Sequence, residues 1–213
     1  LSTRRQRQMC IRDSTYSDPG SFLRSRNEFN RSVLKMHYGN IFLRGQGFSP
    51  SGQFPFIDKV NTKTFEKTRV YQSSYTDKIE SIIDYDPKKN QLTVSIESPS
   101  EYPNYYTKKV KSGKLEKLTN LKNPFLELQN VKKEKITYLR NDGVELSGIL
   151  YLPLNYDKEK KEKMPMILWA YPREFKDRQS ASQNTKNSNE FTYPYYGSMA
   201  VSYTHLRAHE TTV

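Results

Sequence analysis

Cysteine is almost absent from the 213 residues: Cys10 is the only one, so cysteine usage indicates no redox compartment. Histidine is nearly as scarce, with 3 residues, and no cluster of histidine and cysteine has the spacing of metal ligands. Hydrophobic residues make up only 34%, and no run approaches the roughly 18 apolar residues of a membrane-spanning helix. We therefore expect no metal, no cofactor and no membrane partner.

Aromatic residues are abundant, at 13%, with 16 tyrosines and 10 phenylalanines. Disordered chains are poor in aromatics, so the composition predicts a folded protein. Together with threonine, valine and isoleucine, these residues favour half-buried β-strands with one solvent-exposed face. The net charge of +12 is compatible with nucleic-acid binding, but the lysines are scattered over turns instead of lying on one helix or stripe. We expect no nucleic-acid partner and keep a basic nucleic-acid-binding protein as an alternative.

The two ends differ in character from the middle of the chain. Residues 1–14 and 202–213 show neither strand nor helix periodicity, and both resemble translated sequencing adapters. A pair of ordinary tails is the other interpretation. We exclude both segments from the fold prediction, and Cys10, His205 and His209 are excluded with them.

A repeat with a spacing of about 50 residues organises the first half of the chain. Turn residues 38–40 and 88–90 each separate two short apolar-rich runs, which is typical of β-hairpins. The second unit then divides into four strands, near residues 79–85, 91–97, 104–111 and 114–119. Four short antiparallel strands per repeat are typical of β-propeller blades, which bury their faces by stacking. Chance similarity of two lysine-rich hairpins is the alternative. Five identities align the units, Asn40 with Asn90, Lys59 with Lys109, Val60 with Val110, Glu66 with Glu116 and Lys67 with Lys117.

The pattern changes near residue 124. Residues 134–140 alternate as a strand, Asn141-Asp142-Gly143 is a strong hairpin turn, and residues 144–153 form the returning strand. A charged segment, residues 157–163, is interpreted as a solvated loop. The continuous apolar run at residues 166–170 predicts a strand buried on both faces. An antiparallel hairpin that leads into a buried strand is how an α/β-hydrolase sheet begins.

Two segments carry a resemblance to a known family. Residues 136–153, followed by the run Trp169-Ala170-Tyr171-Pro172-Arg173-Glu174-Phe175-Lys176, resemble the prolyl oligopeptidase family of serine peptidases, and most of all its glutamyl-endopeptidase branch. Residues 38–40, 45–50 and 97–105 look like the propeller of that branch. The resemblance implies a β-propeller paired with an α/β-hydrolase domain, a Ser-His-Asp triad, and cleavage of peptides after acidic residues. It also favours the periplasm or the cell exterior over the cytoplasm.

Most of the catalytic chemistry implied by the resemblance is missing. The expected nucleophile elbow, Gly-x-Ser-x-Gly, does not occur; residues 47–52 come nearest, with the second glycine one place late, and a turn is the better interpretation. His37 falls in an expected propeller strand, where a structural role is favoured. In the family the triad lies further along than this chain extends. We therefore expect no hydrolytic activity from these residues alone.

Two residues are candidates for the site of the intact enzyme. In the family a tyrosine directly after this buried strand donates its hydroxyl to the oxyanion, and Tyr171 matches that position. Arg173 is a weaker candidate for binding an acidic substrate side chain, because a guanidinium pairs bidentately with carboxylates. A phenol packed with its hydroxyl in solvent and a surface ion pair with Glu174 are the respective alternatives.

The expected fold class is mostly β, with about two propeller blades followed by the first strands of an α/β-hydrolase domain. The expected boundaries are residues 15–123 for the C-terminal blades and residues 124–201 for the start of the peptidase domain. The expected function is a fragment of a serine peptidase that acts on peptides. A non-enzymatic propeller that binds other molecules is the second alternative, and the oligomeric state is left open.

Overall fold

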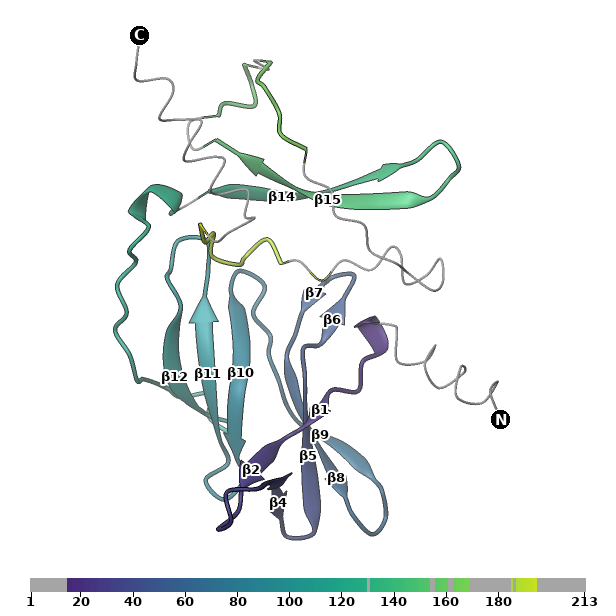
Figure 1. Cartoon of the computed structure of the whole chain (residues 1–213), viewed down its shortest axis with the longest axis vertical. Helices are drawn as coiled ribbons and strands as arrows, with labels where there is room; N and C mark the ends of the chain where they lie inside the picture. Colours follow the sequence, from purple (N-terminus) through teal and green to yellow (C-terminus); the bar gives the residue numbers. More distant parts are fainter. Residues whose placement is uncertain are drawn as a thin grey trace.

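The computed structural model describes residues 15–129, 131–153, 156–160, 163–168, 185 and 187–194. Within these ranges the chain is mostly β-structure arranged in open antiparallel sheets (Figure 1), which confirms the expected class at that level. In the same ranges no helix is long and apolar enough to cross a membrane. The elements are η1 (Thr15–Ser17), β1 (Ser21–Phe22), β2 (Arg24–Arg26), β3 (Ser32–Leu34), β4 (Met36–His37), β5 (Asn40–Gly45), β6 (Phe48–Ser49), β7 (Gly52–Gln53), β8 (Phe56–Asn61), β9 (Lys67–Gln72), β10 (Ile79–Asp86), β11 (Gln91–Glu97), β12 (Asn104–Lys109), β13 (Leu115–Lys117), η2 (Leu126–Leu128), β14 (Lys132–Leu139) and β15 (Glu145–Leu152).

The first sheet is built around β5. Strand β8 pairs with one edge of β5, and β9 pairs with β8. The other edge of β5 is shared by two short strands, with β4 opposite its first residues and β1 opposite its last. Between β1 and β4 the chain leaves the sheet as a small separate hairpin, β2–β3. Taken in order, β4, β5, β8 and β9 form a four-stranded antiparallel meander.

The second sheet, β10-β11-β12-β13, is a meander of the same kind. Its strands lie close to the predicted ranges, because the sequence of β11 alternates apolar and polar residues. Leu92 and Val94 are completely buried on one face, while Thr93 and Ser95 lie half-buried on the other. Alternation with a period of two exposes one set of side chains and buries the other, which fixes the register of the strand.

Each meander contains an equivalent backbone hydrogen bond between two of its turns. The N–H of Thr62 donates to the carbonyl of Gly39 at 2.9 Å, and the N–H of Val110 donates to the carbonyl of Asn90 at 3.1 Å. The repeat is therefore present in the backbone, but its predicted alignment by a constant spacing is wrong. Lys109 takes the place of Asn61 in the following turn, two residues beyond Lys59. Loops of unequal length shift the spacing within each unit.

The hydrophobic core lies between the two meanders. Phe42 and Ile57 from the first sheet pack with Leu92 and Val94 from the second, and Ile57, Leu92 and Val94 are fully buried. Burial of this kind contributes about 25 cal/mol per Å² of apolar surface, so stacking of the sheets is what stabilises both. The remaining buried members of the core are Leu23, Ile82, Tyr85 and Ile96.

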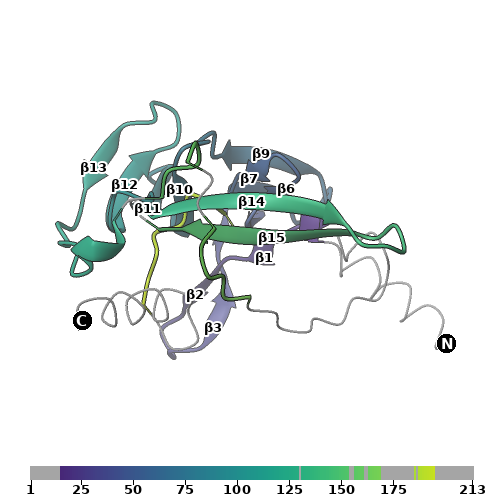
Figure 2. The ribbon, with the colours of Figure 1, turned by 90° about the horizontal axis from the view of Figure 1, so that it is seen from above.

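The third sheet is the hairpin β14–β15, which crosses one end of the meanders (Figures 1 and 2). The predicted turn is confirmed: Gly143 has φ 77°, and its N–H donates to the carbonyl of Arg140 at 2.8 Å. The side chain of Arg140 also donates to Asp142 at 2.8 Å, and this pairing holds the pKa of Asp142 at about 2.

The predicted strand at residues 166–170 is wrong for its described part. Residues 163–168 adopt no regular structure, and Met166, Ile167 and Leu168 are exposed. A continuous apolar run forms a buried strand only if neighbouring strands pair with both of its edges. Among the described residues, β14 and β15 pair only with each other. Trp169 and Ala170 lie outside the described residues.

Candidate functional site: the junction at one end of the sheets

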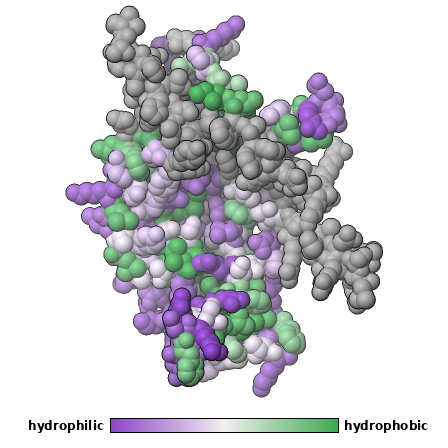
Figure 3. Space-filling model, viewed as in Figure 1, coloured by the Kyte–Doolittle hydropathy of each residue, from purple (hydrophilic) through white to green (hydrophobic). Residues whose placement is uncertain are grey.

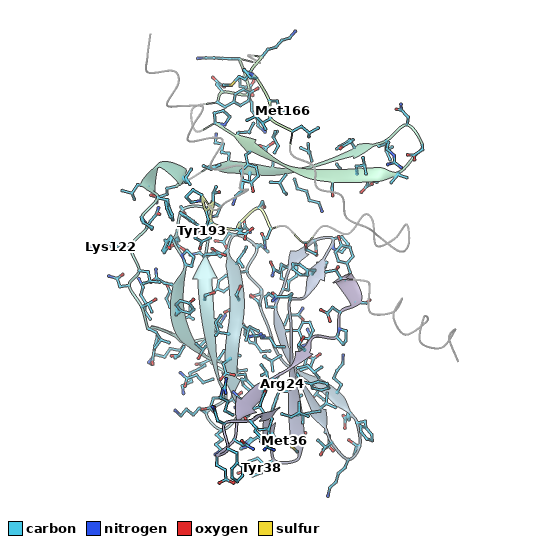
Figure 4. The ribbon with its side chains drawn as sticks, in the orientation of Figure 1. Arg24, Met36, Tyr38, Lys122, Met166 and Tyr193 are labelled. Atoms are coloured by element: carbon cyan, nitrogen blue, oxygen red, sulfur yellow. The ribbon has the colours of Figure 1, made fainter. Side chains whose placement is uncertain are left out.

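Tyr171, predicted as the oxyanion donor, and Arg173, predicted to bind an acidic substrate side chain, lie outside the described residues. Residues 187–194, further along the chain, are described and contact the sheets. The end of β11, the start of β14 and residues 187–194 converge there (Figure 4). Three segments that are far apart in sequence thus form one contact region, which we name the junction cluster: Glu97, Tyr102, Lys133, Phe191 and Tyr193.

Aromatic packing holds residues 187–194 against the second sheet. Phe191 is 2% exposed, and its ring lies 5.3 Å from the ring of Tyr102 and 5.3 Å from that of Tyr193, edge to face in both cases. The rings of Tyr102 and Tyr193 also meet at 6.1 Å. The tyrosine-rich sequence at residues 193–196 favours packing over a binding site, and the ring contacts of Tyr193 agree with that interpretation.

Charged groups surround this aromatic set. The phenol of Tyr193 donates to the carboxylate of Glu97 at 3.4 Å, and the ammonium of Lys133 donates to the backbone carbonyl of Glu190. Burial, followed by the nearby charge of Glu190, raises the pKa of Glu97 above that of an ordinary glutamate. Burial lowers the pKa of Lys133. Burial and then the Glu97 carboxylate raise the pKa of Tyr193, so its phenol stays protonated and remains a donor.

We expect the junction cluster to tighten as the solution becomes mildly acidic. Folding raises the pKa of Glu97, so protonation of its carboxyl group favours the folded contact. This effect is complete below the unfolded pKa and is lost as pH rises through the folded pKa. Lys133, with its lowered pKa, acts with the opposite sign and only in the alkaline range. Hydrogen-exchange protection factors for residues 187–194 should therefore rise a few-fold between neutral pH and the acid range.

The matched control for this prediction is Glu97→Gln, which keeps the shape and the Tyr193 contact but cannot titrate. Its protection factors should not vary over the same pH range. A wild-type response that persists in Glu97→Gln would assign the effect to another group, of which Glu190 is the nearest by charge.

Two hollows flank the junction cluster. One, of about 250 Å³, is lined by strands β11 and β12 and by the segment that leads from β13 to η2. The buried amide nitrogen of Asn123 lies on this hollow and has no hydrogen-bond partner among the described residues. The other, of about 110 Å³, lies between the β6–β7 hairpin and residues 187–189. Its side chains are mostly neutral and polar, including Gln53, Asn187 and Asn189.

The chemistry of acyl transfer is not assembled in the described ranges. His37, the one histidine there, lies on β4 with its ring 4.1 Å from that of Tyr38, and no serine side chain bonds to it within those ranges. The nearest match to an elbow, residues 47–52, forms the small β6–β7 hairpin, which confirms the turn interpretation. Nor do the described histidine, aspartate and glutamate side chains gather in any group that could hold a metal ion.

Sequence reasoning missed Glu97 and Lys133 as members of one cluster. Each lies at a strand end in an unremarkable polar context, and only folding brings the two strand ends together. The one signal available was the apolar and aromatic character of residues 191–194 within a polar region.

No protein-family model matches the chain. Curated relatives do, and they place the chain among peptidase-related proteins. They include the "Probable glutamyl endopeptidase, chloroplastic" of Arabidopsis thaliana, 33% identical over 194 residues, and the protein of the same name from Oryza sativa subsp. japonica, 33% identical over 193 residues. Each alignment covers 84% of this chain. The chain is thus similar to glutamyl endopeptidases over most of its length, which confirms the resemblance found in the sequence.

The chain spans only about a fifth of these relatives, 20% of the first and 21% of the second. Similar solved structures include the AtxE2 isopeptidase in its apo form and as a variant with Astexin3 bound. They match at a TM-score of 0.35, with 15% and 13% sequence identity, and cover 64% of this chain and 22% of theirs. A TM-score at this level is too low for an argument about function.

Proposed function

We propose that the chain is part of a serine peptidase of the glutamyl-endopeptidase type, which hydrolyses peptide bonds by acyl transfer. The observation that carries the proposal is the 33% identity to glutamyl endopeptidases over 84% of the chain. An alignment of that extent includes much of the sheet region as well as residues beyond it. The expected preference for cleavage after acidic residues belongs to the same proposal.

In this proposal the two meanders are neighbouring blades of a β-propeller, and β14–β15 opens an α/β-hydrolase domain. The assignment of the meanders as blades is supported by the core that two antiparallel four-stranded units share, and by the equivalent hydrogen bond within each unit. The predicted boundary near residue 124 falls between β13 and η2, where the second meander has ended. The junction cluster then joins the last blade to the peptidase domain.

The proposed roles of the predicted residues follow from position. Tyr171 donates its phenolic hydroxyl to the oxyanion of the tetrahedral intermediate, and Arg173 faces an acidic substrate side chain. In the longer protein encoded by the same gene, Tyr171→Phe should lower kcat by about 10²–10³-fold with little change in KM, because the donor acts in the transition state. An unchanged kcat would remove the assignment of Tyr171.

The 213-residue chain by itself should not hydrolyse peptides, because no complete triad is recognisable in its sequence. The test is a fluorogenic peptide with glutamate before the scissile bond, combined with labelling by a fluorophosphonate, which marks activated serines. We expect neither turnover nor labelling, and no difference for Ser49→Ala, the serine nearest to an elbow. Labelling of the wild-type chain would contradict the expected inactivity, and its loss in Ser49→Ala would locate the nucleophile.

A further inference from the structure

Two aromatic side chains occupy turn positions with a positive φ, which glycine or asparagine usually takes. Tyr38, in the turn between β4 and β5, has φ 45° and is 89% exposed. Phe65, in the turn between β8 and β9, has φ 59° and is 78% exposed. A positive φ is strained for any bulky side chain. Such strain persists only where packing or function compensates for it. Packing does not supply that compensation, because both side chains are largely in solvent.

The second meander provides an internal comparison for Phe65. In the first turn the N–H of Phe65 donates to the carbonyl of Asn61 at 2.9 Å. In the second turn the N–H of Gly113 donates to the carbonyl of Lys109 at 2.8 Å, and Gly113 has φ 68°. The same turn is therefore made with glycine in one unit and with phenylalanine in the other. The backbone gains nothing from the aromatic ring, so the ring has a use outside the turn.

These turns lie together at the end of the molecule opposite β14–β15. The turns between β4 and β5, β8 and β9, and β10 and β11 all lie at the lower end in Figure 1, and Figure 4 places Tyr38 and Met36 there. The hydrogen bond from Thr62 to Gly39 joins the first two turns directly. Met36 is itself more than half exposed. Three apolar side chains, Met36, Tyr38 and Phe65, thus project at one end of the first meander.

Basic residues lie on the turns of the second meander, two of which are joined by the hydrogen bond from Val110 to Asn90. Lys88 and Lys89 are exposed between β10 and β11, and Lys111 is exposed between β12 and β13. Within the described residues neither these lysines nor Lys63, in the turn of Phe65, take part in an ion pair. Figure 3 shows hydrophobic and hydrophilic side chains next to one another at this end. The acidic residue within these turns is Glu66; Asp86 and Glu116 lie on the adjoining strands β10 and β13, and Glu116 is paired with Lys114.

We propose that this end of the molecule docks on the surface of an anionic lipid bilayer. Tyr38, Phe65 and Met36 would enter the boundary between headgroups and acyl chains, and Lys63, Lys88, Lys89 and Lys111 would lie at the level of the lipid phosphates. Apolar insertion combined with several basic groups is the pairing that gives stable but reversible membrane attachment. Aromatic side chains suit the membrane interface because their apolar rings can enter the boundary while the polar turn that carries them stays hydrated. The expectation of no membrane partner rested on the lack of a spanning segment, which a peripheral contact does not need.

The shape of the surface favours lipid over a soluble polyanion. The apolar side chains project from the tips of turns, whereas an extended acidic peptide is bound in a groove or along a free strand edge. A single-stranded nucleic acid stacks its bases on aromatic faces arranged along a charged groove, and the aliphatic Met36 offers no such face. Neither hollow described above lies at this end, because both flank the junction cluster.

The test is co-sedimentation of the full chain with vesicles of phosphatidylcholine alone and with vesicles containing about one-third phosphatidylserine. We expect binding to the anionic vesicles only, weakening as salt is added, because exposed charges are screened. The double variant Tyr38→Asn with Phe65→Gly should lose about tenfold or more of that binding. Both replacements suit a positive φ, so the variant should fold, and a thermal melt checks that it does.

The matched control is Leu126→Asn, which removes an exposed apolar side chain of η2, away from these turns, and should leave vesicle binding unchanged. Equal binding of the wild type and the double variant, or no binding to anionic vesicles, would overturn the proposal. Binding of polyglutamate or a single-stranded oligonucleotide in place of vesicles would overturn it as well. None of these outcomes depends on peptidase activity, so the proposal stands or fails separately from the proposed function.

Discussion

Replacing Lys108 with alanine should lower the free energy of unfolding by about 3–5 kcal/mol. The ammonium of Lys108 lies 2.8 Å from a carboxylate oxygen of Glu80 and 2.6 Å from the phenolic oxygen of Tyr71. The side chain of Glu80 has no exposed surface, and the phenol of Tyr71 donates to it as well. Burial, with help from Glu80, raises the pKa of Tyr71, so the phenol remains a donor. Without Lys108, a carboxylate would stay buried with no cation beside it.

The control for Lys108 replaces the whole polar set by apolar residues of similar volume. A triple variant, Lys108→Met with Glu80→Leu and Tyr71→Phe, leaves no unpaired charge and should recover most of the lost stability. Urea unfolding followed by circular dichroism measures both variants. A loss below about 1 kcal/mol for Lys108→Ala would mean that water reaches Glu80 in the folded protein, contrary to its burial.

Ile57→Ala should cost about 2–5 kcal/mol, because Ile57 is fully buried between the two meanders and its truncation leaves a cavity. Ile57→Val, which removes a single methylene group, should cost only about 0.5–1.5 kcal/mol. Since the core joins both sheets, the loss should appear in one shared transition. Near-ultraviolet circular dichroism and exchange of the β11 amides should report the same midpoint. Two separate midpoints would contradict a common core.

The strands of the second meander and the hairpin turn at Asn141-Asp142-Gly143 could be predicted from the sequence. In both cases the information is local: alternation in β11 identifies the buried face, and glycine supplies the positive φ of the turn. The repeat could be predicted in kind but not in alignment. The alignment of the two units depends on the backbone hydrogen bonds to Gly39 and Asn90, and identical lysines at equal spacing do not reveal these bonds.

Other features depend on contacts that sequence patterns do not contain. Glu80 and Lys108 are an ordinary acid and an ordinary base until folding places them opposite each other between the sheets. The same holds for Glu97 and Lys133 in the junction cluster. Residues 166–168 show the converse case, because an apolar run predicts a buried strand only where partner strands are available to pair with it. Tyr171 and Arg173 stay predictions.

The detour that the chain makes between β1 and β4 has a practical consequence. Its outer part, residues 27–31, is closed by a hydrogen bond from the N–H of Asn27 to the carbonyl of Arg31, and Phe29 at its tip is exposed. Its base is fixed instead, since Leu23 is buried and Lys35 is paired with Asp84 at 2.6 Å. Peptide tags or whole reporter domains should therefore be accepted at residues 28–30 without disturbing the neighbouring strands.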